Sequence, residues 1–179
     1  GNNITLYQKF CGGDLVGVDP TSGTATHVWD KSPLDTALTA TAVTGTNQTY
    51  GVERFPDSDG AYGVLISDCE IPAGWTGQVD AIVWGKTTGT GNFRIQLATK
   101  CYGSNETPDA AFNTASVYTM SAGVSGQLVR YTLTNMTMTG CVANELLFVR
   151  VFRDRTEASD TLNSTFDLKS IKFFARNTH

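Results

Sequence analysis

Short segments in which apolar and polar residues alternate recur along most of this chain, and they constrain its fold more than any other feature. Such alternation places one set of side chains on each face of an extended strand. In residues 78–84 (QVDAIVW), Val79, Ala81 and Val83 share one face, and residues 93–97 (FRIQL) repeat the pattern. Turn residues separate these segments every eight to fourteen positions. The pattern predicts eight to ten strands.

Three pairs of neighbouring segments are predicted to form antiparallel hairpins. The most apolar stretch is 145–175, in which two strands flank the polar segment 154–165, and we expect it to be the centre of the core. Residues 78–84 and 93–97 form the second pair, joined by the Gly/Thr-rich segment 87–92. The third pair is 50–55 with 62–66, joined by the turn Pro-Asp-Ser-Asp-Gly.

The composition supports an all-β protein. Charged residues are only 17% of the chain, and the 18 glycines and many threonines suit turns and half-exposed strands. No βαβ rhythm is visible, so we predict an antiparallel two-sheet β-sandwich of jelly-roll type. One short helix is expected over 107–115, with Thr107 as its N-cap and Pro108 at the first position. We assign 50–179 to the sandwich and 1–49 to an N-terminal arm or extra strands packed on it, within one domain overall.

The four cysteines are widely spaced and none forms a C-x-x-C pair. With only two histidines in the chain, a zinc site is not expected, and we predict no metal. An even number of cysteines suits disulfides, although buried free thiols are equally consistent with the pattern. Cys101 ends one predicted strand and Cys141 precedes another, so we favour Cys101–Cys141, and Cys11–Cys69 follows by elimination.

The charge pattern gives no reason to expect a nucleic-acid or membrane partner. The net charge is −4, the sequence pI is near 5.0, and the basic residues are scattered except for Arg150, Arg153 and Arg155. A nucleic-acid backbone demands clustered basic residues. No run of eighteen apolar residues exists that would span a bilayer.

The sequence carries no catalytic signature and no cofactor motif, and we predict a protein that is not an enzyme. His27 is the only histidine apart from the terminal one, and no G-x-S-x-G segment is present. Glu53, Asp80 and Glu145 are the candidate carboxylates for glycoside hydrolysis. Each lies in a strand context, where a single solvent-facing carboxylate is the ordinary explanation.

Aromatic residues raise the possibility of carbohydrate binding, because sugar rings stack on exposed aromatic side chains. Trp75 is the best candidate, since it lies in a Gly-flanked loop at 73–77, and Trp29 is a second. The structural alternative, which we favour for Trp75, is a plug that closes one end of the sandwich. Trp84, at a strand end, is expected in the core or at its rim.

The charged segment 153–162 suggests a loop clamp. Its alternating charges at Arg153, Asp154 and Arg155 could contact a neighbouring subunit. A bond from Arg153 to Asp160, tying the two ends of the loop, explains them equally well, and we favour it.

The order of several weak motifs resembles a broad group of β-sandwich domains found in bacteriophage virion proteins. The matching positions are a P-x-x-W entry at 71–75, the strand-ending Trp84, the Gly/Thr loop at 87–92, the D-x-A-F turn at 109–112 and the R-D…D-T-L loop at 153–162. The resemblance covers roughly residues 50–176 and leaves the first fifty unplaced. It implies a structural protein located in the virion, in capsid decoration, a head fibre or the tail, with capsid or tail proteins and copies of itself as partners. A carbohydrate-binding module that holds glycans through Trp75 is the alternative.

Overall fold

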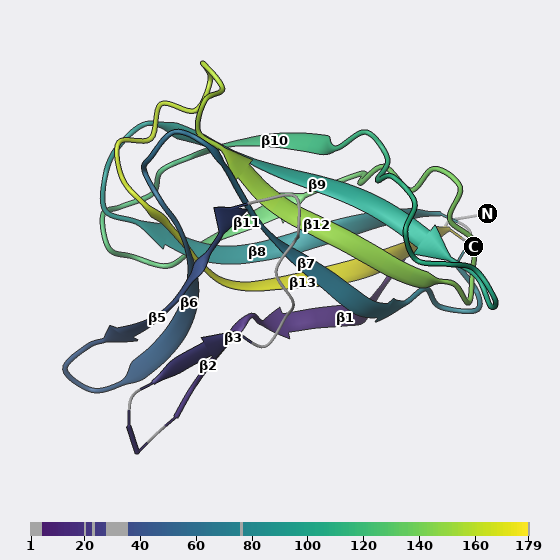
Figure 1. Ribbon diagram of the computed structural model, residues 1–179, viewed down its shortest axis with the longest axis horizontal. Coiled ribbons are helices and arrows are strands. Elements are labelled where there is room, and N and C mark those ends of the chain that lie inside the picture. The colour runs from purple at the N-terminus through teal and green to yellow at the C-terminus, as the bar shows by residue number, and fades with distance from the viewer. Residues whose placement is uncertain (1–4, 20, 23, 28–35, 76, 179) are drawn as a thin grey trace.

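Two β-sheets packed face to face make up most of the molecule (Figure 1). The computed structural model describes residues 5–19, 21–22, 24–27, 36–75 and 77–178 of the 179-residue chain. The prediction of an all-β sandwich of jelly-roll type is confirmed. No helix among the described residues is long and apolar enough to cross a membrane.

One sheet has six strands and the other has five, and nearly all neighbours are antiparallel. The six-stranded sheet has the order β11 (Val129–Leu133), β8 (Gln78–Thr87), β13 (Phe166–Thr178), β6 (Thr49–Phe55) and β5 (Thr39–Thr44), with β1 (Thr5–Asp14) also paired to β13. The five-stranded sheet has the order β10 (Ser116–Ser121), β9 (Asn92–Tyr102), β12 (Leu146–Asp154), β7 (Ala61–Glu70) and β4 (Thr36–Ala37), of which β4 pairs in parallel with β7. A separate ribbon is formed by β2 (Val16–Val18) and β3 (Ala25–His27).

The alternation in the sequence determines which side chains form the core. Val79, Ala81 and Val83 of β8 are fully buried, as are Ile171 and Phe173 opposite them on β13. The five-stranded sheet contributes its own alternate residues from β9 and β12, and the two inner faces meet in one continuous hydrophobic cluster. A two-sheet core of this kind requires one apolar face from each strand, which the period-two pattern supplies.

The three predicted hairpins are wrong. β6 and β7, β8 and β9, and β12 and β13 each have one member in the six-stranded sheet and the other in the five-stranded sheet. The chain therefore crosses the core at each of these turns, and the most apolar stretch contributes one strand to each sheet. Alternation identifies the buried face of a strand, and that face is the same whether the next strand lies beside it or opposite it.

Two of these crossings support each other at one end of the sandwich. The segment between β8 and β9 packs on the segment between β12 and β13, where the Gly89 amide donates to Ser164 Oγ at 2.9 Å and the Thr90 amide donates to Asn163 Oδ1 at 2.9 Å. A hairpin would have satisfied these amides within its own turn. Here they bond to a segment more than seventy residues away, so the short connection is held as an arch.

The predicted helix over 107–115 is absent. The described part of the chain contains no helix, and this segment is an irregular loop after β9. A helix this short has too few internal hydrogen bonds to offset the cost of its nucleation. Its amides bond elsewhere: the Asn113 amide donates to the Thr99 carbonyl at 2.9 Å, and the Ala110 amide donates to the Tyr102 hydroxyl.

Residues before position 50 add strands to the sandwich. β1 pairs with β13 from Thr5↔Thr178 to Asp14↔Ser170, while β6 pairs with the other end of the same edge, at 166–168. β5 forms a hairpin with β6. In Figure 1 this hairpin and the β2–β3 ribbon extend together from the lower left of the sandwich.

Both favoured disulfides are present. Cys11–Cys69 joins β1 of the six-stranded sheet to β7 of the five-stranded sheet, with Cα atoms 5.4 Å apart. Cys101–Cys141 joins the end of β9 to the loop that precedes β12, with Cα atoms 5.2 Å apart. The described residues include no free cysteine. The first bridge therefore links the two layers covalently.

Candidate functional site: a groove on the outer face of the five-stranded sheet

Strand β12 carries large side chains on both of its faces. Val149 and Val151 point into the core and are fully buried, whereas Phe148, Arg150 and Phe152 alternate with them and point to the outer face of the sheet. An outer sheet face in water is usually polar. The two phenylalanines therefore indicate that something covers this face or binds to it.

The cover is the loop between β9 and β10, over residues 103–115. Tyr102, at the end of β9, holds this loop by two hydrogen bonds to one residue. Its hydroxyl accepts from the Ala110 amide at 3.1 Å and donates to the Ala110 carbonyl at 3.3 Å. The Asn113 side-chain amide donates to the Thr139 carbonyl at 2.8 Å. These bonds fix the loop above the sheet at two points.

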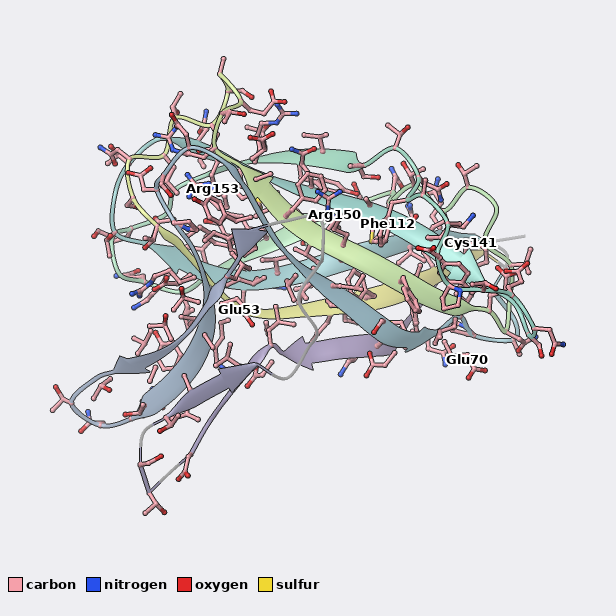
Figure 2. The ribbon with its side chains drawn as sticks, in the orientation of Figure 1. Glu53, Glu70, Phe112, Cys141, Arg150 and Arg153 are labelled. Carbon is pink, nitrogen blue, oxygen red and sulfur yellow. A yellow bond between two sulfur atoms is a disulfide. The ribbon has the colours of Figure 1, made fainter. Side chains whose placement is uncertain are left out.

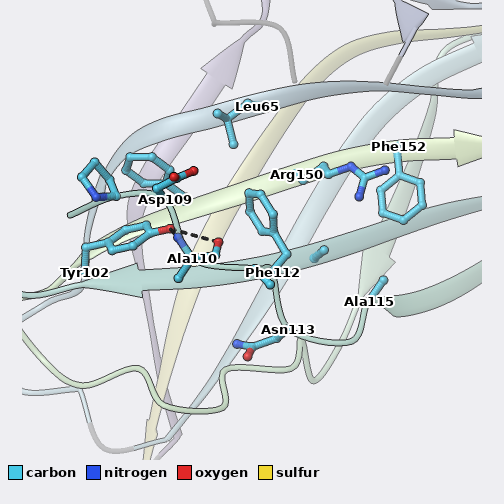
Figure 3. A pocket seen from close by; sticks show the side chains of 13 residues that line it. Leu65, Tyr102, Asp109, Ala110, Phe112, Asn113, Ala115, Arg150 and Phe152 are labelled. Atoms are coloured by element: carbon cyan, nitrogen blue, oxygen red, sulfur yellow. Dashed lines mark hydrogen bonds between the residues drawn. The ribbon is translucent and has the colours of Figure 1, made fainter. Parts of the chain in front are cut away.

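Between the loop and the sheet lies a groove of about 540 Å³ (Figure 3). Its volume lies within the roughly 300–1,000 Å³ typical of ligand sites. The sheet contributes Leu65, Ala98, Tyr102, Phe148, Arg150 and Phe152, and the loop contributes residues 108–113 and Ala115. Figure 3 shows the ring of Phe112 extending from the loop toward the strand that carries Arg150. Figure 2 places both residues on the same side of the molecule.

Aromatic contacts hold the floor of the groove in a defined geometry. The Arg150 guanidinium lies 4.3 Å from the centre of the Phe152 ring, and the Tyr102 and Phe148 rings meet edge to face at 5.0 Å between centroids. A guanidinium stacked on a ring keeps its plane fixed, so its N–H groups point in fixed directions. The floor therefore combines ring surfaces with an oriented donor.

The polar groups of the groove are suited to binding. Its walls carry one cation, Arg150, one carboxylate, Asp109, and one amide, Asn113, among rings and alanine side chains. No histidine, cysteine or serine lines it among the described residues. Ring surfaces with few fixed polar groups are typical of sites that recognise small uncharged molecules.

The tryptophans named from the sequence do not form this groove. Trp75 is partly buried against the core, and its indole N–H donates to the Gln78 carbonyl at 3.4 Å. That position agrees with a plug at the end of the sandwich. Trp29 lies outside the described residues. Trp84, expected in the core or at its rim, is 37% exposed on the outer face of the other sheet.

The Arg153–Asp160 ion pair is present and fully buried (Figure 2 labels Arg153). Arg153 Nε donates to Asp160 Oδ2 and Arg153 Nη2 to Asp160 Oδ1, both at 2.7 Å. The same guanidinium donates to the carbonyls of Pro56 and Ser164 at 3.2 Å and to that of Leu162 at 3.4 Å. This side chain thus ties the loop that follows β12 to the turn that follows β6.

Of the other charged residues of this loop, Asp154 has a separate partner, whereas Arg155 bonds Asp57 and also donates to the Asp160 carbonyl at 2.9 Å. Asp154 forms a local turn, with its Oδ1 accepting from the Thr156 amide at 3.0 Å, and it takes no part in the buried pair. Arg155 bonds Asp57 at 2.8 Å near the surface. That ion pair holds the pKa of Arg155 above its ordinary value, chiefly through the hydrogen bond to Asp57. The Asp57 carboxylate is therefore engaged in the structure of the turn.

The three candidate carboxylates lie on different surfaces. Glu53 is buried on the inner side of β6, whereas Asp80 lies on the outer face of β8 and accepts from the Asn135 amide at 2.8 Å. Glu145 accepts from the Val142 amide in the loop before β12. The structure does not bring them together as an acid–base pair. Within the described ranges, no three His, Cys, Asp or Glu side chains are grouped as a metal site would require.

The groove residues were missed because they lie in one predicted helix and on strands whose pairing was mispredicted. A signal was nonetheless present in residues 148–152 (FVRVF), where apolar residues occupy both faces of one strand. A strand that is apolar on both sides is covered on both sides. That pattern identifies β12 as the place to search for a covering loop or a ligand.

Comparison with known proteins gives similarity of fold alone. No protein-family model matches the chain, and no curated protein sequence matches it. Among solved structures, a family 11 carbohydrate-binding module from Clostridium thermocellum in complex with a β-1,3-1,4-mixed-linked tetrasaccharide is 14% identical, with a TM-score of 0.44 over 76% of this chain and 81% of that one. A family 61 module in complex with β-1,4-galactotriose is 12% identical, with a TM-score of 0.43 over 82% and 90%. A family 28 module specific for non-crystalline cellulose is 12% identical, with a TM-score of 0.43 over 84% and 87%.

At these identities and TM-scores, the three structures do not bear on any individual residue of this chain. None of the comparisons tests the expected relation to bacteriophage virion proteins, which stays a prediction.

Proposed function

We propose that this chain binds carbohydrate, and that the groove between the 103–115 loop and the five-stranded sheet holds a neutral saccharide. The proposal rests on one observation: Phe112 from the loop and the stacked Arg150–Phe152 pair from the sheet line two walls of the same groove. A pyranose ring has apolar C–H faces and a rim of hydroxyls. The groove offers ring surfaces for the faces and fixed polar groups for the rim.

The balance of charge favours an uncharged sugar. Arg150 and Asp109 give the groove one group of each sign, so neither a cationic nor an anionic ligand is preferred. A hydroxyl both donates and accepts hydrogen bonds, and it can therefore use the guanidinium, the carboxylate and the Asn113 amide in turn. The Phe152 ring orients the guanidinium in advance, which lowers the entropy cost of the bond.

The test is titration calorimetry with a panel of soluble neutral oligosaccharides, on the wild-type protein and on Phe112→Ala. Phe112 lies on the loop wall and is half-buried, outside the core. Loss of an aromatic anchor at a binding centre costs about 2 kcal/mol or more, which is about 30-fold in affinity. Val117→Ala, an exposed residue of β10 that does not line the groove, is the matched control and should bind as wild type.

Three results would count against the groove. Equal affinity of Phe112→Ala and the wild type for the same sugar would place the site elsewhere. Absence of binding across the whole panel would remove the neutral-saccharide proposal. If sugar binding is instead lost in Trp75→Ala, the loop at 73–77 is the site and the interpretation of Trp75 as a plug fails.

A second candidate, a structural protein of a virus particle, is supported by the two hairpins that project from one end of the sandwich. Projecting strands with free edges are a common means of contact between subunits. Native mass spectrometry tests this proposal. A monomer at all concentrations, with no affinity for capsid or tail proteins, would count against it. Neither candidate requires catalysis, so we also propose that the protein is not an enzyme.

A further inference from the structure

The outer face of the six-stranded sheet gathers basic residues that are far apart in the sequence. Val79, Ala81 and Val83 point into the core, so the residues between them point outward, and the paired residues on β11 and β13 lie on the same face. Four basic side chains occupy outward positions on these three neighbouring strands, namely Lys86, Arg130, Lys172 and Arg176.

Three more basic residues flank them: Lys9 on β1, Arg54 on β6 and Lys169 in the bulge of β13. Within the described residues this face carries three carboxylates, so it has an excess of four positive charges in a chain whose formal net charge is −4. These basic residues are scattered along the sequence, as expected, but the pairing of the strands places them on one face of the sheet.

The three carboxylates are each engaged by one cation. Asp14 bonds Lys169 at 2.6 Å, Asp167 bonds Arg54 at 2.7 Å, and Asp80 lies 3.5 Å from Arg176. In the part of the chain that the structure describes, Lys86, Arg130 and Lys172 form no ion pair. With Lys9 of β1, the face therefore presents four cations whose charge is not neutralised by a neighbouring carboxylate.

An exposed aromatic ring lies among Lys86, Arg130 and Lys172. Trp84 lies on β8 directly between Arg130 of β11 and Ser170 of β13. Beside it is a hollow of about 340 Å³ lined by Asp80, Ile82, Arg130, Thr132, Thr134 and Phe174. The threonine hydroxyls can donate to and accept from a ligand hydroxyl, and the Trp84 ring can stack on a flat apolar surface.

A second ring holds two of the lysines in place. Lys86 Nζ and Lys169 Nζ lie 5.9 and 5.8 Å from the centre of the Tyr50 ring. Cations at this distance from a ring face are attracted by its quadrupole. The position of Lys86, two residues after Trp84 on β8, is thereby restrained, which lowers the entropy cost of binding an anion there.

We propose that this face is a second binding site, for a linear polysaccharide that carries carboxylate or sulfate groups. Trp84 would stack on one sugar ring, and Lys86, Arg130 and Lys172 would bind acidic groups of that ring and its neighbours. Adjacent strands lie about 4.8 Å apart, so cations on neighbouring strands suit a polymer with one charge on each sugar. The site lies on the opposite side of the sandwich from the neutral groove and does not depend on it.

The same face is poorly suited to nucleic acid. Duplex DNA carries one negative charge for about every 1.7 Å of its axis, and binding it requires a dense cationic surface. Here three carboxylates lie among the cations, and they would repel a phosphate backbone of that density. A polysaccharide with more widely spaced charges can place its hydroxyls next to those carboxylates instead.

The probe is polygalacturonate, with its fully methyl-esterified form as the matched uncharged polymer, and the readouts are tryptophan fluorescence and affinity electrophoresis. The wild type should bind the acidic polymer, bind the ester at least about tenfold more weakly, and lose affinity as NaCl is raised. Lys172→Glu and Arg130→Glu should each weaken binding by about ten- to a hundredfold, the range for one charge-assisted hydrogen bond. Trp84→Ala should weaken binding and remove the fluorescence change.

Two controls separate this site from the groove. Lys100→Glu makes the same charge change on the other sheet and should bind polygalacturonate as wild type does. Phe112→Ala should also leave that binding unchanged, whereas Trp84→Ala should leave neutral-sugar binding unchanged. Near-ultraviolet circular dichroism confirms that each variant is folded.

The proposal is overturned if the acidic and esterified polymers bind equally, if Lys172→Glu binds polygalacturonate as well as Lys100→Glu does, or if neither polymer binds. Tighter binding of a single-stranded oligonucleotide than of polygalacturonate would assign the face to nucleic acid instead. Failure of neutral-sugar binding alone removes the groove and leaves this site standing.

Discussion

Replacing Arg153 by methionine should destabilise the protein more than any single change at its surface. The guanidinium is 1% exposed and donates to both oxygens of Asp160 and to the carbonyls of three residues. Methionine fills much of the space and makes none of these bonds. The Asp160 carboxylate would remain buried, with its principal counter-charge gone.

The expected cost is about 3–5 kcal/mol, which is the range for removing one partner of a buried ion pair. We expect the upper end, because the three carbonyls also lose their donor. The whole stability of a domain is about 5–15 kcal/mol, so the variant should be marginally folded. With a urea m-value of about 2.5 kcal/mol/M, the unfolding midpoint should fall by about 1–2 M.

Urea denaturation followed by tryptophan fluorescence measures this change. The control is Glu157→Gln, which breaks the exposed Arg94–Glu157 pair and should cost at most about 1 kcal/mol. The double variant Arg153→Met/Asp160→Leu removes both buried charges, so it should be more stable than the sum of the two single changes predicts. A loss below about 1 kcal/mol for Arg153→Met, or strict additivity in the double variant, would refute the clamp.

Two further predictions concern pH and the disulfides. Burial raises the pKa of Tyr118 and of Tyr131 above the ordinary value of 10.0, so the unfolded chain ionises first, and stability should be fully present below pH 10 and fall as pH rises above it. Urea denaturation between pH 9 and 11 measures that decline, which should be shallower in Tyr131→Phe; an equal slope in the two proteins would contradict it. Replacing Cys11 and Cys69 by serine should lower the free energy of unfolding by about 4 kcal/mol, because the bridge closes a 58-residue loop. Addition of a reducing agent should lower the free energy of unfolding of the wild type by at least as much. A change under about 1 kcal/mol in urea denaturation would show that the bridge constrains little.

The fold class was predictable because alternation is a local property of the chain. The inward positions of β8 and β9 are the ones the sequence indicates, since Val79, Ala81, Phe93 and Ile95 are all buried. The choice of partner strand is not local. The segment between β8 and β9 forms an arch because its amides bond residues 163 and 164, and nothing within residues 87–92 specifies that contact.

The buried clamp was predictable for a different reason. Arg153 and Asp160 lie seven residues apart at the two ends of one loop, so their opposite charges could be paired from the sequence. Of the three carbonyls bound by Arg153, those of Leu162 and Ser164 lie in the same connection after β12, whereas Pro56 is 97 residues away and only the fold brings it near.

The two candidate sites were not predictable, since both are assembled from distant strands. The groove requires the 103–115 segment to be a loop, and the sequence favoured a helix there because of Thr107 and Pro108. The basic face requires the registers of β8, β11 and β13. The only local signal is in residues 172–176, where Lys172 and Arg176 occupy alternate positions with Phe174 and therefore share one face of the strand.

The Cys11–Cys69 bridge also determines how the protein would respond to a pulling force. Residues between the two cysteines lie inside a covalent loop, so a force applied at the ends of the chain bypasses them through the bond between the sheets. Fully extended, 58 residues would span about 200 Å. That length stays hidden while the bridge is intact, and reduction would release it as an additional increment of extension.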